Sequence, residues 1–295
     1  MEIQWYPGQM AKAKRLMREN IKLVDAVIEV LDARIPASSR NIDIQEILEK
    51  RPVVAALTRS DLADPQATEE WLHELRKDYV LATAVNANSG QGVKTLIQLL
   101  KTIPHRRKHA QRPLRFMIVG IPNVGKSSLI NRLIGRSATM TGDKPGITKG
   151  KQWVRLAGDL ELLDTPGLLW PKIHSKRQAF GLAAVGAVKD EILDPVELGI
   201  ELMNFFLTYT PQSLIKRYKL ASTAGEPQTL LQEIGKRRGC LVKGGEVDLE
   251  AAARLFIKDF REARLGRITL EKVGEMGEEN DGLHQNDSDT DKPLS

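Results

Sequence analysis

One segment in the middle of the chain has the residue types and spacing of a phosphate-binding loop. It reads Gly120-Ile-Pro-Asn-Val-Gly-Lys-Ser127 and lies between an apolar run that predicts a strand and a run that predicts a helix. In such a loop, backbone N–H groups point at phosphate oxygens beside the positive end of the helix. Lys126 is expected to contact the β- and γ-phosphates, and Ser127 is expected to bind Mg²⁺. The other nucleotide contacts expected here are Pro122, Asn123, Val124, Gly125 and Ser128.

A second segment downstream supplies groups that a nucleoside triphosphate site needs. Asp164-Thr-Pro-Gly167 ends another apolar run. A carboxylate at Asp164 can hold Mg²⁺ through water, and the Gly167 amide can contact the γ-phosphate. Between this segment and the phosphate loop, Thr148 is the expected second protein ligand of Mg²⁺, with Thr141 as the alternative.

A third segment, far upstream, can read the base. Asp61 can accept hydrogen bonds from N1–H and the exocyclic amine of guanine, a donor pattern that adenine lacks. Thr58 and Arg59 occupy the first two positions of the usual Asn-Lys-x-Asp motif. A hydroxyl replaces the asparagine amide only in part, whereas the arginine stem and planar head can lie along the base. Asn86 and Ala87 stand where a further backbone contact to the base is expected. Guanine is favoured, and an adenine-specific site remains the alternative because of the two substitutions.

The order of these segments is unusual, because the base-reading segment precedes the phosphate loop. A nucleotide site forms by convergence in space, so this order implies a circular permutation. Apolar runs predict strands at 26–31, 52–57, 80–85, 116–119, 152–156 and 160–163. Helical patterns stand at 9–20, 41–50, 67–77, 92–100 and 128–133. The predicted fold class is α/β: a circularly permuted P-loop GTPase domain with a doubly wound, mainly parallel sheet, followed by a small all-α domain.

Helical periodicity alone continues after the last predicted strand. Helices are predicted at 180–188, 195–208, 211–217, 229–237 and 249–265. The predicted domains are a GTPase domain at 1–175, which contains a basic linker at 104–115, and a helical domain at 176–273. An acidic tail at 274–295 is predicted to be disordered.

The charge of the chain is unevenly distributed. The formal net charge is +6, and the tail carries seven acidic residues and one lysine, a charge of −6, which leaves +12 on residues 1–273. A body this basic favours a nucleic-acid partner, with solubility as the alternative reason. The basic clusters are Lys12, Lys14, Arg15 and Arg18; Arg106, Arg107 and Lys108; and Lys216, Arg217, Lys236, Arg237 and Arg238.

Cysteine, histidine and hydropathy patterns exclude several classes. The single cysteine, Cys240, excludes a disulfide framework, and the five histidines lack the spacing of metal ligands. The sequence has neither a signal peptide nor a long uninterrupted apolar span, so no membrane partner is expected. The predicted location is the cytoplasm.

With these motifs in this order, the chain resembles the RbgA/YlqF family of circularly permuted GTPases, which assist assembly of the large ribosomal subunit. The resemblance extends from Ile3-Gln-Trp-Tyr-Pro-Gly8 through Leu31-Asp-Ala-Arg-Ile-Pro36 and Lys144-Pro-Gly-Ile-Thr148 to Leu265-Gly-Arg-Ile-Thr-Leu-Glu271. It implies hydrolysis of GTP to GDP and phosphate, with Mg²⁺, by a monomer that binds ribosomal RNA. The C-terminal helices are then expected to dock on the precursor of the large subunit, and hydrolysis is expected to release the protein.

The resemblance also identifies candidate catalytic groups. Leu168 stands where many GTPases have a water-positioning glutamine. The family is thought to use a histidine in its N-terminal Trp-Phe-Pro-Gly-His-Met stretch instead, and the matching residue here is Gln9. Glutamine can orient a water but cannot accept a full proton, and capping of the helix is the alternative role. Gln9, Lys126 and Gly167 are therefore the expected catalytic residues of an enzyme with slow intrinsic turnover, activated by the RNA particle. Asn123 matches the asparagine that binds K⁺ in K⁺-dependent GTPases, with a role in the turn as the alternative.

Two further functions remain open at this point. One is a nucleotide-gated RNA-binding scaffold with negligible hydrolysis, which Leu168 and Gln9 would explain. The other is a GTPase that acts on tRNA.

Overall fold

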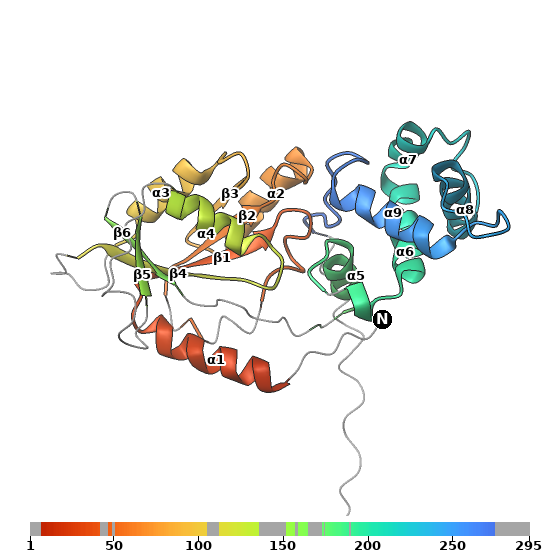
Figure 1. Ribbon diagram of the computed structural model, residues 1–295. Coiled ribbons are helices and arrows are strands. Elements are labelled where there is room, and N and C mark those ends of the chain that lie inside the picture. The colour runs from red at the N-terminus through yellow and green to blue at the C-terminus, as the bar shows by residue number, and fades with distance from the viewer. Residues whose placement is uncertain are drawn as a thin grey trace, which may run out of the picture.

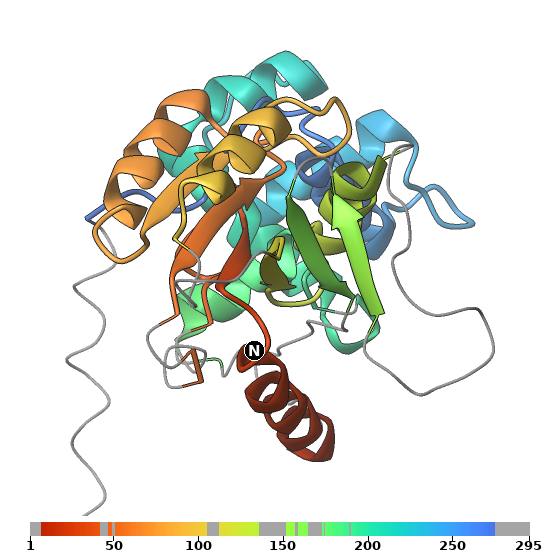
Figure 2. The same ribbon diagram turned by 90° about the vertical axis from the view of Figure 1, so that its left-hand side faces the viewer.

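The computed structural model describes residues 7–41, 47–48, 51–104, 112–135, 152–156, 159–164, 173, 175–188 and 190–274. A twisted sheet with helices on its faces forms one side of the molecule, and a group of helices forms the other (Figures 1 and 2). Most of the predicted helix at 41–50, most of the linker and nearly all of the acidic tail lie outside the described residues.

The sheet of the described residues is mainly parallel, as predicted. Its strands are β1 (Ala26–Asp32), β2 (Val53–Thr58), β3 (Leu81–Ala84), β4 (Leu114–Val119), β5 (Gln152–Leu156) and β6 (Leu160–Asp164). Their order in space is β3-β2-β1-β4-β6-β5. The pairs β1–β2, β2–β3, β1–β4 and β4–β6 are parallel, and β5 pairs antiparallel with β6. Each predicted strand is present, with bounds that shift by at most two residues.

The centre of this sheet is where its strand order reverses. From β1 the chain continues to β2 and β3 on one side, and after β4 it adds the edge strand β5 and then β6 on the other. In open α/β sheets, ligands bind outside the carboxyl ends of the strands at such a reversal. The phosphate-loop segment follows β4, and the base-reading segment follows β2, with β1 between these two strands.

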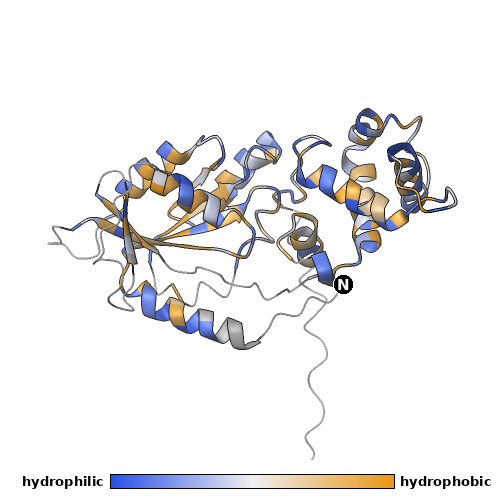
Figure 3. Cartoon of the chain, in the orientation of Figure 1, coloured by the Kyte–Doolittle hydropathy of each residue, from blue (hydrophilic) through white to orange (hydrophobic). Residues whose placement is uncertain are grey.

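Two helical layers cover the sheet because its strands are apolar on both faces. The helices are α1 (Pro7–Ile21), α2 (Pro65–Leu75), α3 (Val93–Lys101) and α4 (Lys126–Ile134). Ile28 and Val30 of β1 belong to the core that includes residues of α3 and α4, whereas Val27 and Leu31 belong to the core that includes residues of α1 and α2. Figures 1 and 2 show α1 across the sheet from α3 and α4, and Figure 3 shows the apolar strands between them. Alternation of side chains along each strand creates the two cores.

The second part of the molecule is helical, as predicted. It contains α5 (Lys176–Ala184), a short 3-10 helix (Asp190–Ile192), α6 (Pro195–Tyr209), α7 (Pro211–Tyr218), α8 (Pro227–Arg238) and α9 (Leu249–Arg261). Phe206 of α6 anchors it, with ring centroids 5.6 Å from Phe256 and 6.2 Å from Phe260 on α9. None of the helices in the described ranges is long and apolar enough to cross a membrane.

Two predicted helices in this part had wrong boundaries. The helix predicted at 180–188 begins at Lys176, where the Ser175 side chain accepts a hydrogen bond from the Gln178 N–H, and it ends at Ala184 before a turn at Gly186. The helix predicted at 249–265 ends at Arg261. There Ala263 adopts a positive φ of 54°, which a continuing helix cannot contain.

After α9 the chain returns to the sheet, which the sequence did not predict. Residues 265–272, here called the return segment, lie against the loops that follow β1 and β2. The N–H of Leu270 donates to the Arg34 carbonyl at 2.8 Å, and the indole N–H of Trp71 donates to the Glu271 carbonyl at 2.9 Å. The C-terminal end of the helical part is therefore fixed to the loops at the edge of the sheet.

Candidate nucleotide-binding site

The phosphate-loop segment turns tightly between β4 and α4. Gly120 has a φ of 152°, and a Cβ there would lie 2.6 Å from the Val30 carbonyl oxygen on the neighbouring strand. Gly125 has a φ of 91° and stands directly before the first residue of α4. A side chain at Gly120 would push β4 and β1 apart, so the sequence requires glycine where the loop starts.

Lys126 begins α4 and is buried, with 9% of its surface exposed. Its ammonium Nζ donates to the Ile121 carbonyl at 2.5 Å, across the loop. Burial lowers the pKa of Lys126 to about 8. Ser127 and Ser128 are exposed at the start of the same helix, Pro122 is half-buried and Val124 is buried. The loop thus presents backbone N–H groups, a cation and two hydroxyls at one helix N-terminus, which is an anion-binding arrangement.

The base-reading segment contacts this loop directly. The Thr58 hydroxyl, at the end of β2, lies 2.5 Å from the Val124 carbonyl oxygen and 2.9 Å from the Leu31 carbonyl oxygen. It can donate its single proton to one of them at a time. Thr58 has 1% of its surface exposed, so it is a buried contact between the end of β2 and the phosphate loop.

Arg59 makes the second link between the two segments. It has a positive φ of 55°, and its Nη2 donates to the Asn123 carbonyl at 2.6 Å. Its Nη1 lies 3.6 Å from the carboxylate of Asp32, at the end of β1. Asp61 follows two residues later and is half-buried. The structure therefore brings the upstream acid and the phosphate loop to one edge of the sheet.

The loop after β3 is linked to the helix of the phosphate loop. The Asn86 side-chain oxygen accepts from the N–H groups of Asn88 and Ser89 at 2.9 and 3.0 Å, which shapes a tight turn. The Ala87 carbonyl accepts from Nε of Arg132, on α4, at 2.6 Å. Arg132 also donates to the Asn88 carbonyl. Arg132 was not predicted from the sequence, although its place on the helix that begins at Lys126 was a usable signal.

Asn123 connects the phosphate loop to the helical part of the molecule. It is exposed and has a positive φ of 59°, and its side-chain Nδ2 donates to the Gly186 carbonyl at 3.0 Å. Gly186 lies in the turn after α5. Asn123 also accepts a hydrogen bond from Arg59 through its main-chain carbonyl. Asn123 therefore has a structural role in the turn, and its side-chain oxygen is not used by either bond.

Several predicted site residues cannot be placed in full. Thr148 and Gly167 lie outside the described residues, as do Thr141 and Leu168. Gln9 lies in the first turn of α1, and Asp164 is the last residue of β6, and only their backbone positions are described. β6 runs parallel to β4, so Asp164 ends at the edge of the sheet where the phosphate loop begins.

Comparison with known proteins identifies the chain. A family model described as 50S ribosome-binding GTPase matches residues 115–222. Ribosome biogenesis GTPase A from Priestia megaterium is 41% identical over 283 residues, which cover 93% of this chain and 98% of that protein. Ribosome biogenesis GTPase A from Thermotoga maritima is 31% identical over 272 residues, with coverage of 92% and 94%. The chain belongs to the ribosome biogenesis GTPase A family, the RbgA/YlqF family.

A solved structure extends this family relationship to the fold. The GNP-bound crystal structure of YlqF from T. maritima has a TM-score of 0.65 and 28% sequence identity, and the match covers 88% of this chain and 98% of that chain. The predicted family, the GTPase activity and the circularly permuted P-loop fold are thereby confirmed.

Guanine-nucleotide binding follows from membership of this GTPase family, and Mg²⁺ is its expected companion. Among the described residues, no group of three or more His, Cys, Asp or Glu side chains could hold a metal by itself. Mg²⁺ does not need such a group, because it is commonly bound by one or two protein oxygens together with phosphate oxygens and water. The exposed Ser127 hydroxyl at the start of α4 fits that mode of binding.

Arg34 follows β1 and belongs to the family motif Leu31-Asp-Ala-Arg-Ile-Pro36, but it was not assigned a role from the sequence. Arg34 is completely buried and its Nη2 lies 2.8 Å from the Asp32 carboxylate. It also donates to the carbonyls of Val185 and Arg261, both in the helical part, at 3.4 Å. Its sequence signal was an arginine two residues after an aspartate that ends a buried strand. Arg34 thus joins the sheet to the helices at the edge that carries the nucleotide site.

Proposed function

We propose that this GTPase binds ribosomal RNA on the precursor of the large ribosomal subunit, hydrolyses GTP faster there than alone, and is released on hydrolysis. Two contacts best support a single nucleotide site: Thr58 with Val124, and Arg59 with Asn123. They join segments that are far apart in the sequence. In this proposal Asp61 accepts from the guanine, and the loop of Asn86 and Ala87 borders the base.

The phosphate groups would be bound by the loop before α4. Its backbone N–H groups and the Lys126 ammonium contact the β- and γ-phosphates and neutralise charge there. Ser127, Asp164 and Thr148 are the proposed protein groups around Mg²⁺, which supplies charge stabilisation to the transferring phosphoryl group when bound. The Gly167 amide is proposed to sense the γ-phosphate.

Hydrolysis would require a group that orients the attacking water. Gln9 is proposed for this role, and it lies in the first turn of α1. The low intrinsic rate would follow from a glutamine that orients water without accepting its proton. Asn123 is proposed to bind K⁺ through its side-chain oxygen, which its hydrogen bond to Gly186 does not use. Equal hydrolysis rates in K⁺ and Na⁺ would exclude that ion.

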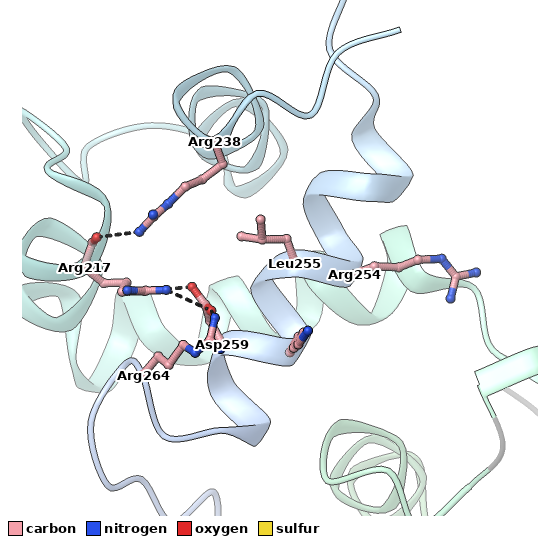
Figure 4. A pocket seen from close by; sticks show the side chains of 7 residues that line it. Arg217, Arg238, Arg254, Leu255, Asp259 and Arg264 are labelled. Carbon is pink, nitrogen blue, oxygen red and sulfur yellow. Dashed lines mark hydrogen bonds and ion pairs between the residues drawn. The ribbon is translucent and has the colours of Figure 1, made fainter.

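The helical part carries a pocket that suits RNA phosphates. A hollow of about 310 Å³, here called the basic pocket, lies among α7, α8, α9 and the residues just after α9 (Figure 4). Five cationic side chains and a single carboxylate line it: Arg217, Arg238, Arg254, Lys258, Arg264 and Asp259. Asp259 is 1% exposed and pairs with Arg217 at 2.8 Å and Arg264 at 3.2 Å, so it holds these two side chains in place. Arginine forks suit the two oxygens of a phosphate, and a ribosomal RNA backbone supplies such phosphates in series.

A single-turnover experiment tests the proposal. Hydrolysis of GTP is measured with the protein alone, with mature large subunits and with precursor large subunits, and sedimentation follows binding in GTP and in GDP. We expect precursor particles to raise the rate at least about tenfold, a fall of about 1.4 kcal/mol in the barrier, and to retain the protein in GTP more than in GDP. A rate that no particle changes would indicate a nucleotide-gated scaffold instead, and stimulation by tRNA alone would indicate the tRNA function.

A further inference from the structure

The return segment binds the loop that carries the proposed base reader. Asp61 lies between β2 and α2, in the loop of residues 59–64. The guanidinium of Arg267, in the return segment, spans this loop. Its Nη2 donates to the Ser60 carbonyl at 2.7 Å, and its Nε donates to the Ala63 carbonyl at 2.9 Å. One side chain therefore holds the backbone on both sides of Asp61.

The residue after Arg267 holds the same loop. The N–H of Ile268 donates to the Leu62 carbonyl at 3.1 Å. Together, Arg267 and Ile268 bind the carbonyls of residues 60, 62 and 63. A planar guanidinium can make two such bonds in a fixed fork, which a lysine ammonium cannot reproduce. A surface loop fixed at three carbonyls has few backbone conformations left, so the direction of the Asp61 side chain is set from outside the loop.

The return segment is itself firmly placed. The Thr269 hydroxyl lies 3.2 Å from the Ala33 carbonyl and accepts from the Asp64 N–H at 3.1 Å. The buried carboxylate of Glu271 accepts from the N–H groups of Ala37 and Ser38. Arg267 is thus presented to the loop by a segment anchored next to β1, which is why its two hydrogen bonds can define the position of the loop.

We propose that Arg267 is a positioning residue for guanine recognition: it fixes the 59–64 loop so that the Asp61 carboxylate meets N1–H and the exocyclic amine. The inference rests on the proposed base reading by Asp61. Arg267 acts through the loop backbone, because its donors bind main-chain carbonyls on either side of that residue. Loss of the Arg267 side chain should therefore weaken the preference for guanine over other bases, as well as the affinity for the nucleotide.

The test compares GDP with inosine diphosphate, which lacks the exocyclic amine, and measures equilibrium affinity and dissociation rate for the full chain. The wild-type protein should prefer GDP about tenfold or more, since the missing amine leaves a carboxylate oxygen unpaired. In Arg267→Ala and Arg267→Gln the preference should fall by about threefold to tenfold, and GDP should dissociate faster. Lys272→Ala is the matched control: it removes a cation of the return segment that lies over the Tyr209 ring, and the preference should not change.

Each outcome separates the inference from the proposed function. A thermally stable Arg267→Ala that keeps the wild-type preference for GDP overturns the inference, even if it binds both nucleotides more weakly. If that variant does not fold, the same result in Arg267→Gln overturns it. Asp61→Asn should shift preference from GDP toward xanthosine diphosphate, whose second carbonyl replaces the amine. If Asp61→Asn does not shift this preference, or if the wild-type protein binds GDP and inosine diphosphate equally, base reading by Asp61 is wrong. The inference about Arg267 is then wrong as well.

Discussion

At the scale of single residues, Lys126 combines burial with a proposed role, phosphate binding, that requires charge. Burial lowers its pKa to about 8, so part of the population is neutral in mildly alkaline solution. A bound β-phosphate favours the ammonium and raises this pKa. GDP binding at about pH 8.5 should therefore take up a proton, and affinity should fall as pH rises above about 8, by at most about tenfold per pH unit.

Calorimetry in buffers of different ionisation enthalpy measures this proton uptake. Lys126→Arg is the control, because arginine stays charged throughout this range and its binding should not be coupled to protonation there. Equal proton uptake by the wild-type protein and Lys126→Arg at alkaline pH would contradict the assignment to Lys126.

The residue scale also shows what could be predicted from sequence. The tight turn that places Lys126 and Ser127 at the start of α4 was predictable because a phosphate loop is a local pattern whose geometry depends on its own glycines. Arg34 and Arg267 were not, because their partners lie far away in the chain and no local pattern reports them. For the same reason the sequence could not indicate that the Thr58 hydroxyl contacts the phosphate loop, or that Asn123 contacts Gly186.

At the scale of elements, the central strands β1 and β2 were predicted well because each is a buried apolar run, and burial is a property of the run itself. Helix ends were predicted less well. The end of α9 depends on the positive φ of Ala263, and the start of α5 depends on the Ser175 cap. The return segment could not be predicted from the sequence, since it is neither helix nor strand. It is held in place by hydrogen bonds of its side chains and by isolated backbone hydrogen bonds.

Glu271 gives the return segment a dependence on pH. Burial raises the pKa of Glu271 above its ordinary value of 4.5, although the N–H groups of Ser38 and Ala37 oppose the shift. The folded state therefore holds the proton more tightly than the unfolded state. The stability contributed by this carboxyl is fully present below the unfolded pKa and is lost as pH rises through the folded pKa.

Urea unfolding of the wild-type protein and of Glu271→Gln, from about pH 4 to neutrality, tests this dependence. The wild-type protein should lose stability relative to the variant as the pH rises, because glutamine cannot ionise. Glu246→Gln, at an exposed position, is the matched control and should follow the wild-type protein. Parallel pH profiles for the wild-type protein and Glu271→Gln would show that the Glu271 carboxyl has no such role.

At the scale of the whole molecule, the described residues include two connections from the helical part to the candidate nucleotide site besides the buried Arg34. Asn123 of the phosphate loop is bonded to the turn after α5, and Arg261 of α9 donates to the carbonyls of Ala183 and Ala184 in the same region. The second connection is the return segment: it begins next to Arg264, which lines the basic pocket. An RNA phosphate bound in the pocket, as proposed, and a nucleotide at the sheet would therefore act on one connected set of backbone segments.

Binding free energies linked in this way are reciprocal. If precursor particles bind the protein more tightly in GTP than in GDP, they must raise its affinity for GTP over GDP by the same factor, for which we expect about fivefold to a hundredfold. Particle affinity measured in each nucleotide, and nucleotide affinity measured with and without particles, give the two factors. Equal particle affinities in GTP and GDP would contradict the coupling, whereas unequal factors would mean only that one of the measurements was not at equilibrium.

Variants of the basic pocket and of the return segment should affect different quantities. Arg254→Ala removes a charge from the pocket, so it should weaken particle binding equally in both nucleotides and lower the salt dependence by about one unit in the logarithmic slope. Arg267→Gln leaves the pocket intact but loosens the return segment. It should keep most of the particle affinity and bring the ratio between GTP and GDP closer to one. If Arg267→Gln keeps the full ratio, the coupling passes through Asn123 and Gly186 or through Arg34 rather than through the return segment.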